Sequence, residues 1–252
     1  MPALGVFCYG SSILFILQEE ANMSLHDYLS GKGDKYDFNE LWNQMRGLTD
    51  GLDNLHKLYK GTEIAYHRDL KPANILITRG TLKIADFGFL EFRPVSLDDT
   101  ENTGVISAHN TGYYAPPWHS RYTREDDIWP LACIVSELAT SDIQGREEVV
   151  KYKEARTADG LSGKDAPRFY LEKKVKSQVL ERHRQLRRTV QPWKSADETD
   201  ETRIFQGKFY STEFITILNR MFRHGQTHST LLEVSGRDDV PDVGQVTGCG
   251  NN

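Results

Sequence analysis

The chain has 252 residues, 38% of them hydrophobic, which is enough to bury a sizeable core in one globular domain. Its 31 basic and 36 acidic residues give a net charge of -5, so composition makes no general case for nucleic-acid binding. The cysteines Cys8, Cys133 and Cys249 fit a reducing compartment better than a disulfide framework, and no segment is long and apolar enough to span a membrane. We therefore expect an intracellular protein, cytoplasmic or nuclear.

The first expected elements are two strands and a long helix. Residues 4–9 and 13–18 are mostly apolar and flank a turn at residues 10–12. Asp37 and Glu40 resemble a capping box, which predicts that a helix begins there. Apolar residues then recur at helical spacing and predict one buried helix face: Phe38, Leu41, Trp42, Met45, Leu48, Leu52 and Leu55.

Residues 66–76, YHRDLKPANIL, bring together side chains suited to phosphoryl transfer. Asp69 could accept a proton from an incoming hydroxyl, and Lys71 could neutralise charge on the transferring phosphate. Asn74 offers a side-chain oxygen to Mg²⁺. Each of these residue types is common in solvated loops, so none of them indicates catalysis alone.

A hairpin and a further carboxylate follow this stretch. The apolar runs 75–77 and 82–85 are separated by a turn that contains Gly80, which predicts a β-hairpin. Asp86, Phe87 and Gly88 come directly after it, so we expect the Asp86 carboxylate to lie beside the loop that carries Asn74. Oxygen ligands on two adjoining segments suit a Mg²⁺ ion that also holds substrate phosphates.

The second half of the chain is expected to be mostly helical. Asp126 and Asp127 precede an apolar stretch that runs to Leu138, which predicts a helix with an acidic N-cap and Pro130 in its first turn. Residues 173–188 carry a basic helix face that is a candidate docking surface for an acidic partner or a membrane, and a solvated face is the plainer alternative. The basic residues of this face are Lys173, Lys174, Lys176, Arg182, Arg184, Arg187 and Arg188.

The last residues give weaker signals. His224 and His228 have the i, i+4 spacing of zinc ligands, but the sequence offers no third ligand. Residues 235–252 are rich in Gly, Asp and Asn without an apolar period, which predicts a disordered tail.

The order HRDLKPAN, hairpin and DFG resembles the catalytic and metal-binding segments of eukaryotic protein kinases, over residues 3–234. Lys71 in its DLKPAN context is similar to the serine/threonine-specific branch. The resemblance implies an α+β, protein kinase-like fold, with a mainly helical C-terminal lobe and a remnant of the N-terminal lobe β-sheet. It divides the chain into a partial small lobe and hinge (1–32), a large lobe (33–234) and the tail (235–252).

The same resemblance implies a reaction and its cofactors. The γ-phosphate of ATP would pass to a protein hydroxyl, with Mg²⁺ bound by Asn74 and Asp86, Asp69 as base and Lys71 as the charge partner of the phosphate. Leu17 would face the adenine, and backbone groups from Gln18 to Glu20 would contact it. An apolar strand with an acidic cap is an equal alternative for this last stretch.

Parts of the nucleotide site that the family possesses are missing from this sequence. A complete kinase has a Gly-rich loop, a strand lysine and a helix glutamate that orients this lysine. No GxGxxG occurs upstream of the catalytic stretch, and no Lys or Arg precedes Lys32. We therefore expect an N-terminally truncated small lobe, in a fragment of a longer protein or in a protein that lacks half of its nucleotide site.

Two other function classes follow from these missing parts. Transfer would be impaired without them, so the main alternative is a pseudokinase that serves as a scaffold or binding module. A small-molecule phosphotransferase of the aminoglycoside-kinase type is a third possibility. Lys71 counts against it, because such enzymes tend to have a His near this position, and so does the stretch 113–117, which resembles a peptide-binding anchor that such enzymes tend to lack.

Arg68 resembles the residue that senses a phosphate on the activation segment of kinases. The hydroxyl residues that could carry this phosphate are Thr100, Thr103, Ser107 and Thr111. The carboxylates with which Arg68 could pair instead are Asp98, Asp99 and Glu101.

The segment 111–117 resembles the APE-type anchor of the family, but Pro117 replaces its glutamate. In the family this glutamate pairs with a buried arginine, and the aligned position here is Ser229, although Arg223 or Arg237 could still reach the area. Losing both partners destabilises less than losing one, because an unpaired buried charge costs most. Asn110 also replaces a threonine that bonds the catalytic residues.

The resemblance gives two more residues a supporting role. Asp127 would hold the backbone of the stretch 66–76, which corresponds to the catalytic loop of the family and is called the catalytic loop below. A simple helix cap is compatible with this role. His67 would pack beneath the DFG segment.

Overall fold

The computed structural model describes residues 3–9, 13–57, 63–94, 112–117, 124–157, 167–172, 174–191 and 201–222. Its helices are α1 (Leu25–Leu29), α2 (Phe38–His56), α3 (Glu125–Gln144), α4 (Arg146–Thr157), α5 (Ser177–Val190), α6 (Glu201–Phe209) and α7 (Thr212–Met221). Its strands are β1 (Ala3–Tyr9), β2 (Ile13–Gln18), β3 (Met23–Ser24), β4 (Glu63–Tyr66), β5 (Ile75–Thr78), β6 (Thr81–Ile84), β7 (Glu91–Pro94), β8 (Tyr170–Leu171) and β9 (Lys174–Val175). The 3₁₀ turns are η1 (Pro72–Asn74) and η2 (Phe87–Phe89).

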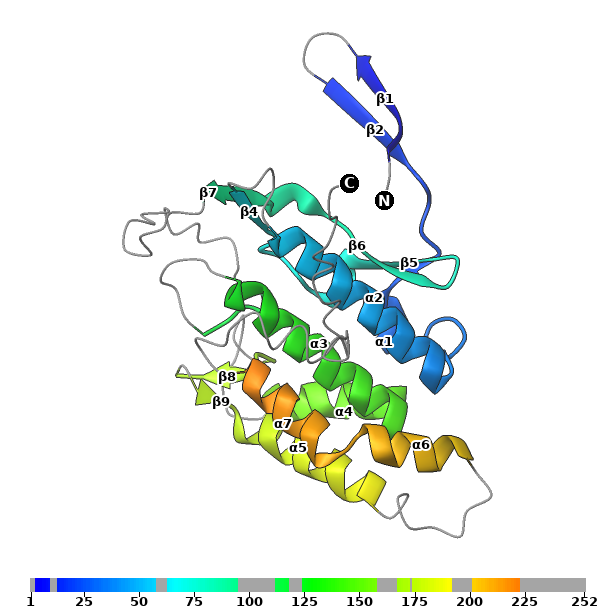
Figure 1. Cartoon of the computed structure of the whole chain (residues 1–252), viewed down its shortest axis with the longest axis vertical. Helices are drawn as coiled ribbons and strands as arrows, with labels where there is room; N and C mark the ends of the chain where they lie inside the picture. Colours follow the sequence, from blue (N-terminus) through cyan, green and yellow to red (C-terminus); the bar gives the residue numbers. More distant parts are fainter. Residues whose placement is uncertain are drawn as a thin grey trace, which may run out of the picture.

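Helix α3 lies in the middle of the helical body, beside α4, α5 and α7 (Figure 1). Every residue from Asp126 to Asp142 is buried. The predicted start of this helix is wrong: Arg124 is the N-cap, and Pro130 lies inside the helix rather than in its first turn. The reason is that the Asp127 carboxylate accepts hydrogen bonds from another segment, the backbone at His67 and Arg68.

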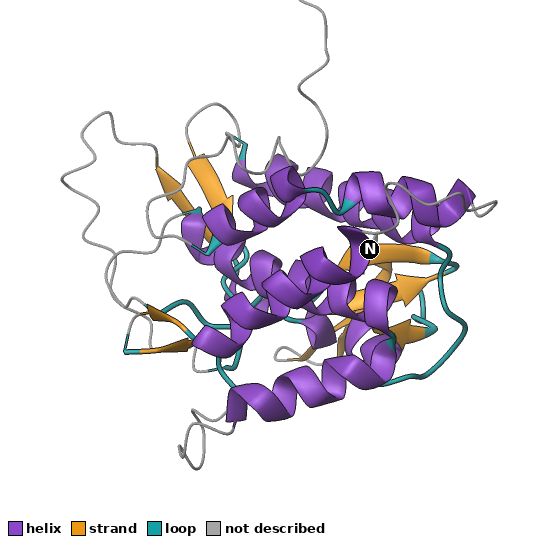
Figure 2. Ribbon diagram, turned by 90° about the horizontal axis from the view of Figure 1, so that it is seen from below, coloured by secondary structure: helices purple, strands orange, loops and turns teal. Residues whose placement is uncertain are grey.

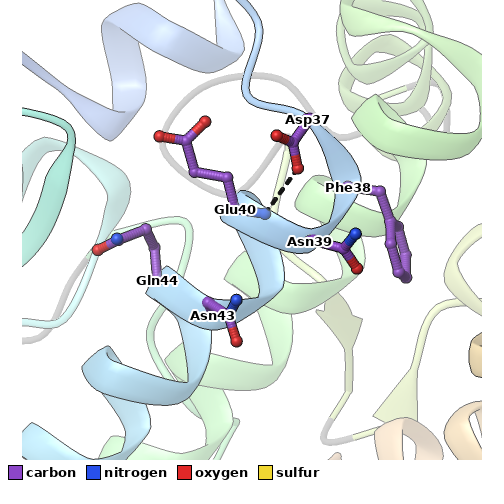
Figure 3. Close-up of a pocket in the computed structure, with 6 residues that line it drawn as sticks. All are labelled: Asp37, Phe38, Asn39, Glu40, Asn43 and Gln44. Carbon is purple, nitrogen blue, oxygen red and sulfur yellow. Dashed lines mark hydrogen bonds between the residues drawn. The ribbon is translucent and has the colours of Figure 1, made fainter.

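Helix α2 confirms the predicted apolar face. Asp37 is its N-cap and accepts a hydrogen bond from the Glu40 amide over 2.8 Å, which is drawn in Figure 3. The predicted stripe is buried except for Trp42 and Leu55, which are partly buried. The open hollow in Figure 3, lined by residues 37–40, 43 and 44, lies at the beginning of this helix and contains none of the expected site residues.

The strands form small antiparallel sheets. In the predicted hairpin, β5 pairs with β6, and β3 pairs with the other edge of β5. Gly80 has a φ of +77° in its turn, a left-handed conformation that glycine adopts without strain. Helices make up most of the described part of the chain, with small sheets beside them (Figure 2), and the expected α+β, kinase-like fold class is confirmed.

The first strands and the first helix differ in how they contact this body. Strands β1 and β2 form a hairpin that projects away from the helices (Figure 1). Leu25 and Tyr28 of α1, in contrast, are buried in the main core cluster with residues of α2 and α3. By packing, α1 is therefore part of the helical body.

Two remaining points concern the ends of the chain and the membrane. The expected tail, 235–252, lies outside the described residues. None of the helices in the described part of the chain combines the length and the apolar character that a membrane crossing requires.

Candidate active site

A buried carboxylate on α3 fixes the backbone of the catalytic loop. Asp127 Oδ2 accepts the His67 amide and Oδ1 accepts the Arg68 amide, both over 2.9 Å. The His56 ring at the end of α2 contributes a third contact, with Nε2 2.9 Å from Oδ2. Burial alone would raise the pKa of Asp127, but these hydrogen bonds and the charge of His56 hold the pKa below its ordinary value. Asp127 therefore acts as an ionised acceptor, and the cap role is excluded.

Held in this way, the loop places three of the predicted residues in contact. Lys71 Nζ lies 2.6 Å from Asp69 Oδ2. Asn74 Nδ2 donates to the same Oδ2 and to the Asp69 carbonyl, each over 2.8 Å. The Asp69 carboxylate thus has a fixed orientation, set by one cation and one amide.

The DFG segment is attached to this loop through the backbone. The Ala85 amide donates to the Asn74 carbonyl over 2.9 Å, and His67 Nε2 lies 3.0 Å from the Ala85 carbonyl. The ring of Phe87 is 5.2 Å from that of His67, which confirms that His67 packs beneath the DFG segment. Asp86 therefore follows directly after a residue that is bonded on both sides to the catalytic loop.

Asp86 and Asn74 present the oxygen atoms that a magnesium ion prefers. The Asp86 backbone has a φ of +60°, its side chain is exposed, and Oδ1 accepts the Gly88 amide over 3.3 Å. Within the described ranges no group of three or more His, Cys, Asp or Glu residues could hold a metal ion. A magnesium site of one carboxylate and one amide completed by substrate phosphates does not need such a group, so the residues present fit the ion.

The residues that are expected to contact adenine are less closely packed against the helical body. Leu17, Gln18 and Glu20 are exposed at the end of the projecting hairpin and just beyond it. Between them, Glu19 pairs with Arg79 over 2.8 Å and lies 3.6 Å from Lys83, both in the β5–β6 hairpin. The segment is thus held near the catalytic loop by partly exposed ion pairs rather than by a core.

Arg68 has a partner that was not among the expected carboxylates. Its guanidinium pairs with Glu91, the first residue of β7, which in turn pairs with Tyr66 at the end of β4. The candidate phosphorylation sites and the three expected carboxylates lie outside the described residues. Glu91 supplies a negative charge of the kind that the hypothesis assigned to a phosphate. The only sequence signal that could have indicated Glu91 as the partner of Arg68 is its position shortly after Asp86, in a strand that leads away from the catalytic loop.

The anchor segment is held by residues that the sequence did not single out. Pro117 is buried, and Tyr114 donates a hydrogen bond to Glu137 of α3, which pairs with Arg156 of α4. Asn110, Arg223, Ser229 and Arg237 are all outside the described residues. The buried charges near this segment are thus paired with each other.

The predicted basic face at 173–188 is not a single exposed surface. Lys176 and Arg182 are buried, and Lys176 donates to the Arg156 carbonyl. Arg184 and Arg188 both pair with Glu181 of their own helix. Much of the positive charge is already neutralised within the chain, and Lys173, His224 and His228 lie outside the described residues.

Comparisons with known proteins agree with this geometry. The sequence model of the family described as "Protein kinase domain" matches residues 3–228. Cyclin-dependent kinase F-3 of Oryza sativa subsp. japonica is 34% identical over 131 residues, which are 50% of this chain and 28% of that protein. Cysteine-rich receptor-like protein kinase 1 of Arabidopsis thaliana is 32% identical over 144 residues, which are 54% of this chain and 22% of that protein.

The chain spans less than a third of the length of these two relatives, with 28% and 22% of them covered. A solved structure, that of the yeast RNA Pol II CTD kinase CTDK-1 complex, is similar with a TM-score of 0.42 and 22% sequence identity. The match covers 57% of this chain and 48% of that chain.

Proposed function

Because this chain belongs to the protein kinase family, we propose that it transfers the γ-phosphate of ATP to a serine or threonine hydroxyl of a protein substrate. The observation that supports this most is the contact of Asp69, Lys71 and Asn74 within a loop held by buried Asp127. A base, a cation and a metal ligand in one fixed group are what phosphoryl transfer requires.

Asp69 is proposed as the base. Lys71 and Asn74 both donate to Oδ2, so Oδ1 is the atom that we expect to accept the proton of the attacking hydroxyl. The two donors also keep the carboxylate from rotating, which preserves the position of Oδ1 during the reaction.

Lys71 and the metal ligands would act on the phosphate. The Lys71 side chain is partly exposed beside Asp69, where its charge can offset negative charge on the transferring group. Mg²⁺ held by Asn74 and Asp86 would neutralise the β- and γ-phosphates when bound. The Asp86 side chain is exposed and accepts a hydrogen bond from the neighbouring Gly88 amide, so an incoming ion can reach its carboxylate from solvent.

The contacts to adenine and the domain boundaries remain predictions. We propose that Leu17 covers the base and that the backbone from Gln18 to Glu20 bonds to it. We also propose 1–32 as the partial small lobe with the hinge, of which only the last helix, α1, packs into the helical body, and 33–234 as the large lobe.

A pseudokinase is the second candidate, and the projecting hairpin favours it. Leu17 is exposed there, so the adenine end of the site is not enclosed by the described residues. Under this hypothesis the chain would keep the fold and its partner-binding surfaces but would not turn over ATP.

Binding of Mg²⁺-ATP, measured by thermal shift, tests the phosphate half of the site first. At 100-fold excess over Kd, bound ligand stabilises the folded state by about 2.7 kcal/mol. We expect Asp86→Ala to lose this stabilisation, because it removes a metal ligand. Asp34→Ala, which changes an exposed aspartate in another loop, should retain it.

Transfer of labelled phosphate from ATP to casein then separates the two candidates. The wild-type chain should label casein, and Asp69→Asn should lower kcat by about 10²- to 10⁴-fold, since it removes the base without changing the shape of the side chain. Magnesium-dependent ATP binding without any transfer would support the pseudokinase. Equal kcat for wild type and Asp69→Asn would refute the role of Asp69.

A further inference from the structure

The DFG segment is attached to the catalytic loop on both of its sides. Before Asp86, the Ala85 amide donates to the Asn74 carbonyl over 2.9 Å, and the Ala85 carbonyl lies 3.0 Å from His67 Nε2. After Asp86, the turn η2 leads into strand β7, which begins at Glu91. Asp86 therefore lies in a short connection between two points of attachment.

The second attachment combines a strand pairing with an ion pair. Strand β7 pairs with β4 (Figure 1), and in this register Glu91 is the partner of Tyr66, the last residue of β4. The Glu91 carboxylate also pairs with the guanidinium of Arg68, which follows Tyr66 by two positions. Both the backbone and the side chain of Glu91 therefore contact the beginning of the catalytic loop.

The ion pair is largely shielded from water on the side of the arginine. The Arg68 side chain is 14% exposed and the Glu91 side chain is 33% exposed. Salt screens such a partly buried pair less than it screens a surface pair, and a hydrogen bond between two charged groups is stronger than a neutral one. Loss of the Glu91 charge would therefore leave a mostly buried guanidinium less neutralised, in the residue directly before Asp69.

The backbone of the DFG segment depends on these attachments. Asp86 has a φ of +60°, a left-handed conformation that residues other than glycine adopt infrequently. Such a conformation persists where the surrounding contacts determine it. The contacts of Ala85 precede Asp86 and those of Glu91 follow it, so the loss of either would let the Asp86 backbone relax.

A phosphate on the chain would act on the same arginine. Phosphorylation orders a segment when the new phosphate becomes a charge-assisted partner of an arginine. Glu91 already gives Arg68 a negatively charged partner from within the folded chain. This pairing needs no modification, so it forms whenever β7 pairs with β4.

We propose that Glu91 is a positioning residue for the metal ligand Asp86, and that its pair with Arg68 replaces an activating phosphate, so that transfer does not require phosphorylation of this chain. The inference rests on the proposed function, because Asp86 needs this position only if it binds Mg²⁺ together with ATP. Glu91 acts through Asp86 and Arg68, and Asp69 remains the base.

Glu91→Gln is the sharpest test, because it removes the charge and keeps the size of the side chain and the strand pairing. The matched control is Glu63→Gln, at the other end of the same two-stranded sheet, where Glu63 is the partner of Pro94. Hydrogen exchange of the amides at 87–92 should become about tenfold faster in Glu91→Gln, because a bond between two charged groups is lost. It should stay unchanged in the control.

Magnesium dependence on the same two variants supplies the readout that a purely structural role would not change. In the presence of ATP, we expect Glu91→Gln to raise the Mg²⁺ concentration for half-maximal thermal stabilisation about tenfold, the lower end of the effect of residues that orient metal ligands. Glu63→Gln should keep the wild-type value. Unchanged exchange in Glu91→Gln would overturn the proposal, and so would faster exchange with an unchanged magnesium dependence.

Removal of phosphate tests the second part of the proposal. Two proteins should keep the kcat of the untreated wild type with casein: the wild type after a phosphatase has removed all phosphate that mass spectrometry detects, and a variant without the candidate hydroxyls. This variant replaces four residues by alanine: Thr100, Thr103, Ser107 and Thr111. A loss of about tenfold or more in both proteins would show that a phosphate is required, and would overturn this part.

Failure of the proposed function is distinguishable from these outcomes. If the untreated wild type neither binds Mg²⁺-ATP nor transfers phosphate, the kinase activity is what is refuted. Exchange at 87–92 that accelerates in Glu91→Gln but not after phosphatase treatment would then still show that Glu91, rather than a phosphate, holds the DFG segment.

Discussion

The helical body and the β1–β2 hairpin are built in opposite ways. In the body, Asp127 is fully buried and makes contacts to His67, Arg68 and His56. In the hairpin, the large apolar side chains are more than half exposed: Leu4 (64%), Val6 (56%), Ile16 (59%) and Leu17 (52%). A two-stranded hairpin without further packing is only marginally stable.

This contrast teaches how the candidate site is divided. The residues proposed to act on phosphate and metal, Asp69, Lys71, Asn74 and Asp86, are attached to the body through the catalytic loop. The residue proposed to cover adenine, Leu17, is on the hairpin. The proposed phosphate half of the site is therefore attached to the body by buried contacts, and the proposed adenine half depends on a weaker element.

Replacing Asp127 by alanine should disturb the body most. The change leaves His56 and two amides without their acceptor, so we expect the free energy of unfolding to fall by about 3–5 kcal/mol. Chemical denaturation measures this loss. The control Asp34→Ala, at an exposed site, should stay within about 0.5 kcal/mol of wild type. A loss for Asp127→Ala no larger than for the control would show that this carboxylate does not hold the loop.

Lowering the pH should destabilise the body through His183. Its Nε2 lies 2.9 Å from Ser136 Oγ and its Nδ1 lies 2.8 Å from Asn219 Oδ1. Burial lowers its pKa from 6.5 to about 4, although the bond to Asn219 opposes this shift. In the unfolded chain His183 therefore binds a proton near pH 6.5, whereas in the folded chain it binds the proton only near pH 4. Stability from this group should be complete above pH 6.5 and should fall by up to about 3 kcal/mol toward pH 4.

Denaturation of wild type and His183→Gln between pH 7.5 and pH 4.5 isolates this effect. We expect the stability of wild type to decline more steeply with falling pH than that of the variant, whatever their absolute difference. Parallel pH profiles would contradict the assignment.

The arrangement of Ser136, His183 and Asn219 resembles that of a nucleophile, a base and an orienting residue. Ser136 and His183 are, however, buried in the body where no substrate reaches them.

The smallest effect is expected in the hairpin. Leu17→Ala should change the free energy of unfolding by less than about 0.5 kcal/mol, because its side chain is exposed. The matched change Leu52→Ala, in the buried face of α2, should cost about 2–5 kcal/mol in the same denaturation experiment. Similar losses for both leucines would mean that the hairpin packs as tightly as the body does, and the contrast would be wrong.

Much of this site could be predicted because its signals are local. Asp69, Lys71 and Asn74 are within six positions of each other, so a single loop brings them together. The hairpin β5–β6 and the apolar face of α2 follow from turn residues and periodicity in the same way. The predicted start of α3 was wrong because the Asp127 carboxylate does not cap its own helix. It accepts hydrogen bonds from the backbone of a loop about 60 positions away in the sequence.

By itself, then, the sequence determined the family and the fold class, since these depend on motifs and on short-range patterns. Only the tertiary structure decided which charges are partners. Glu91 meets Arg68, and Glu137 meets both Tyr114 and Arg156, across separations of 19 to 23 positions. No local pattern marks such pairs. Packing brings these residues into contact, and the cost of leaving a buried charge unpaired then favours the paired arrangement.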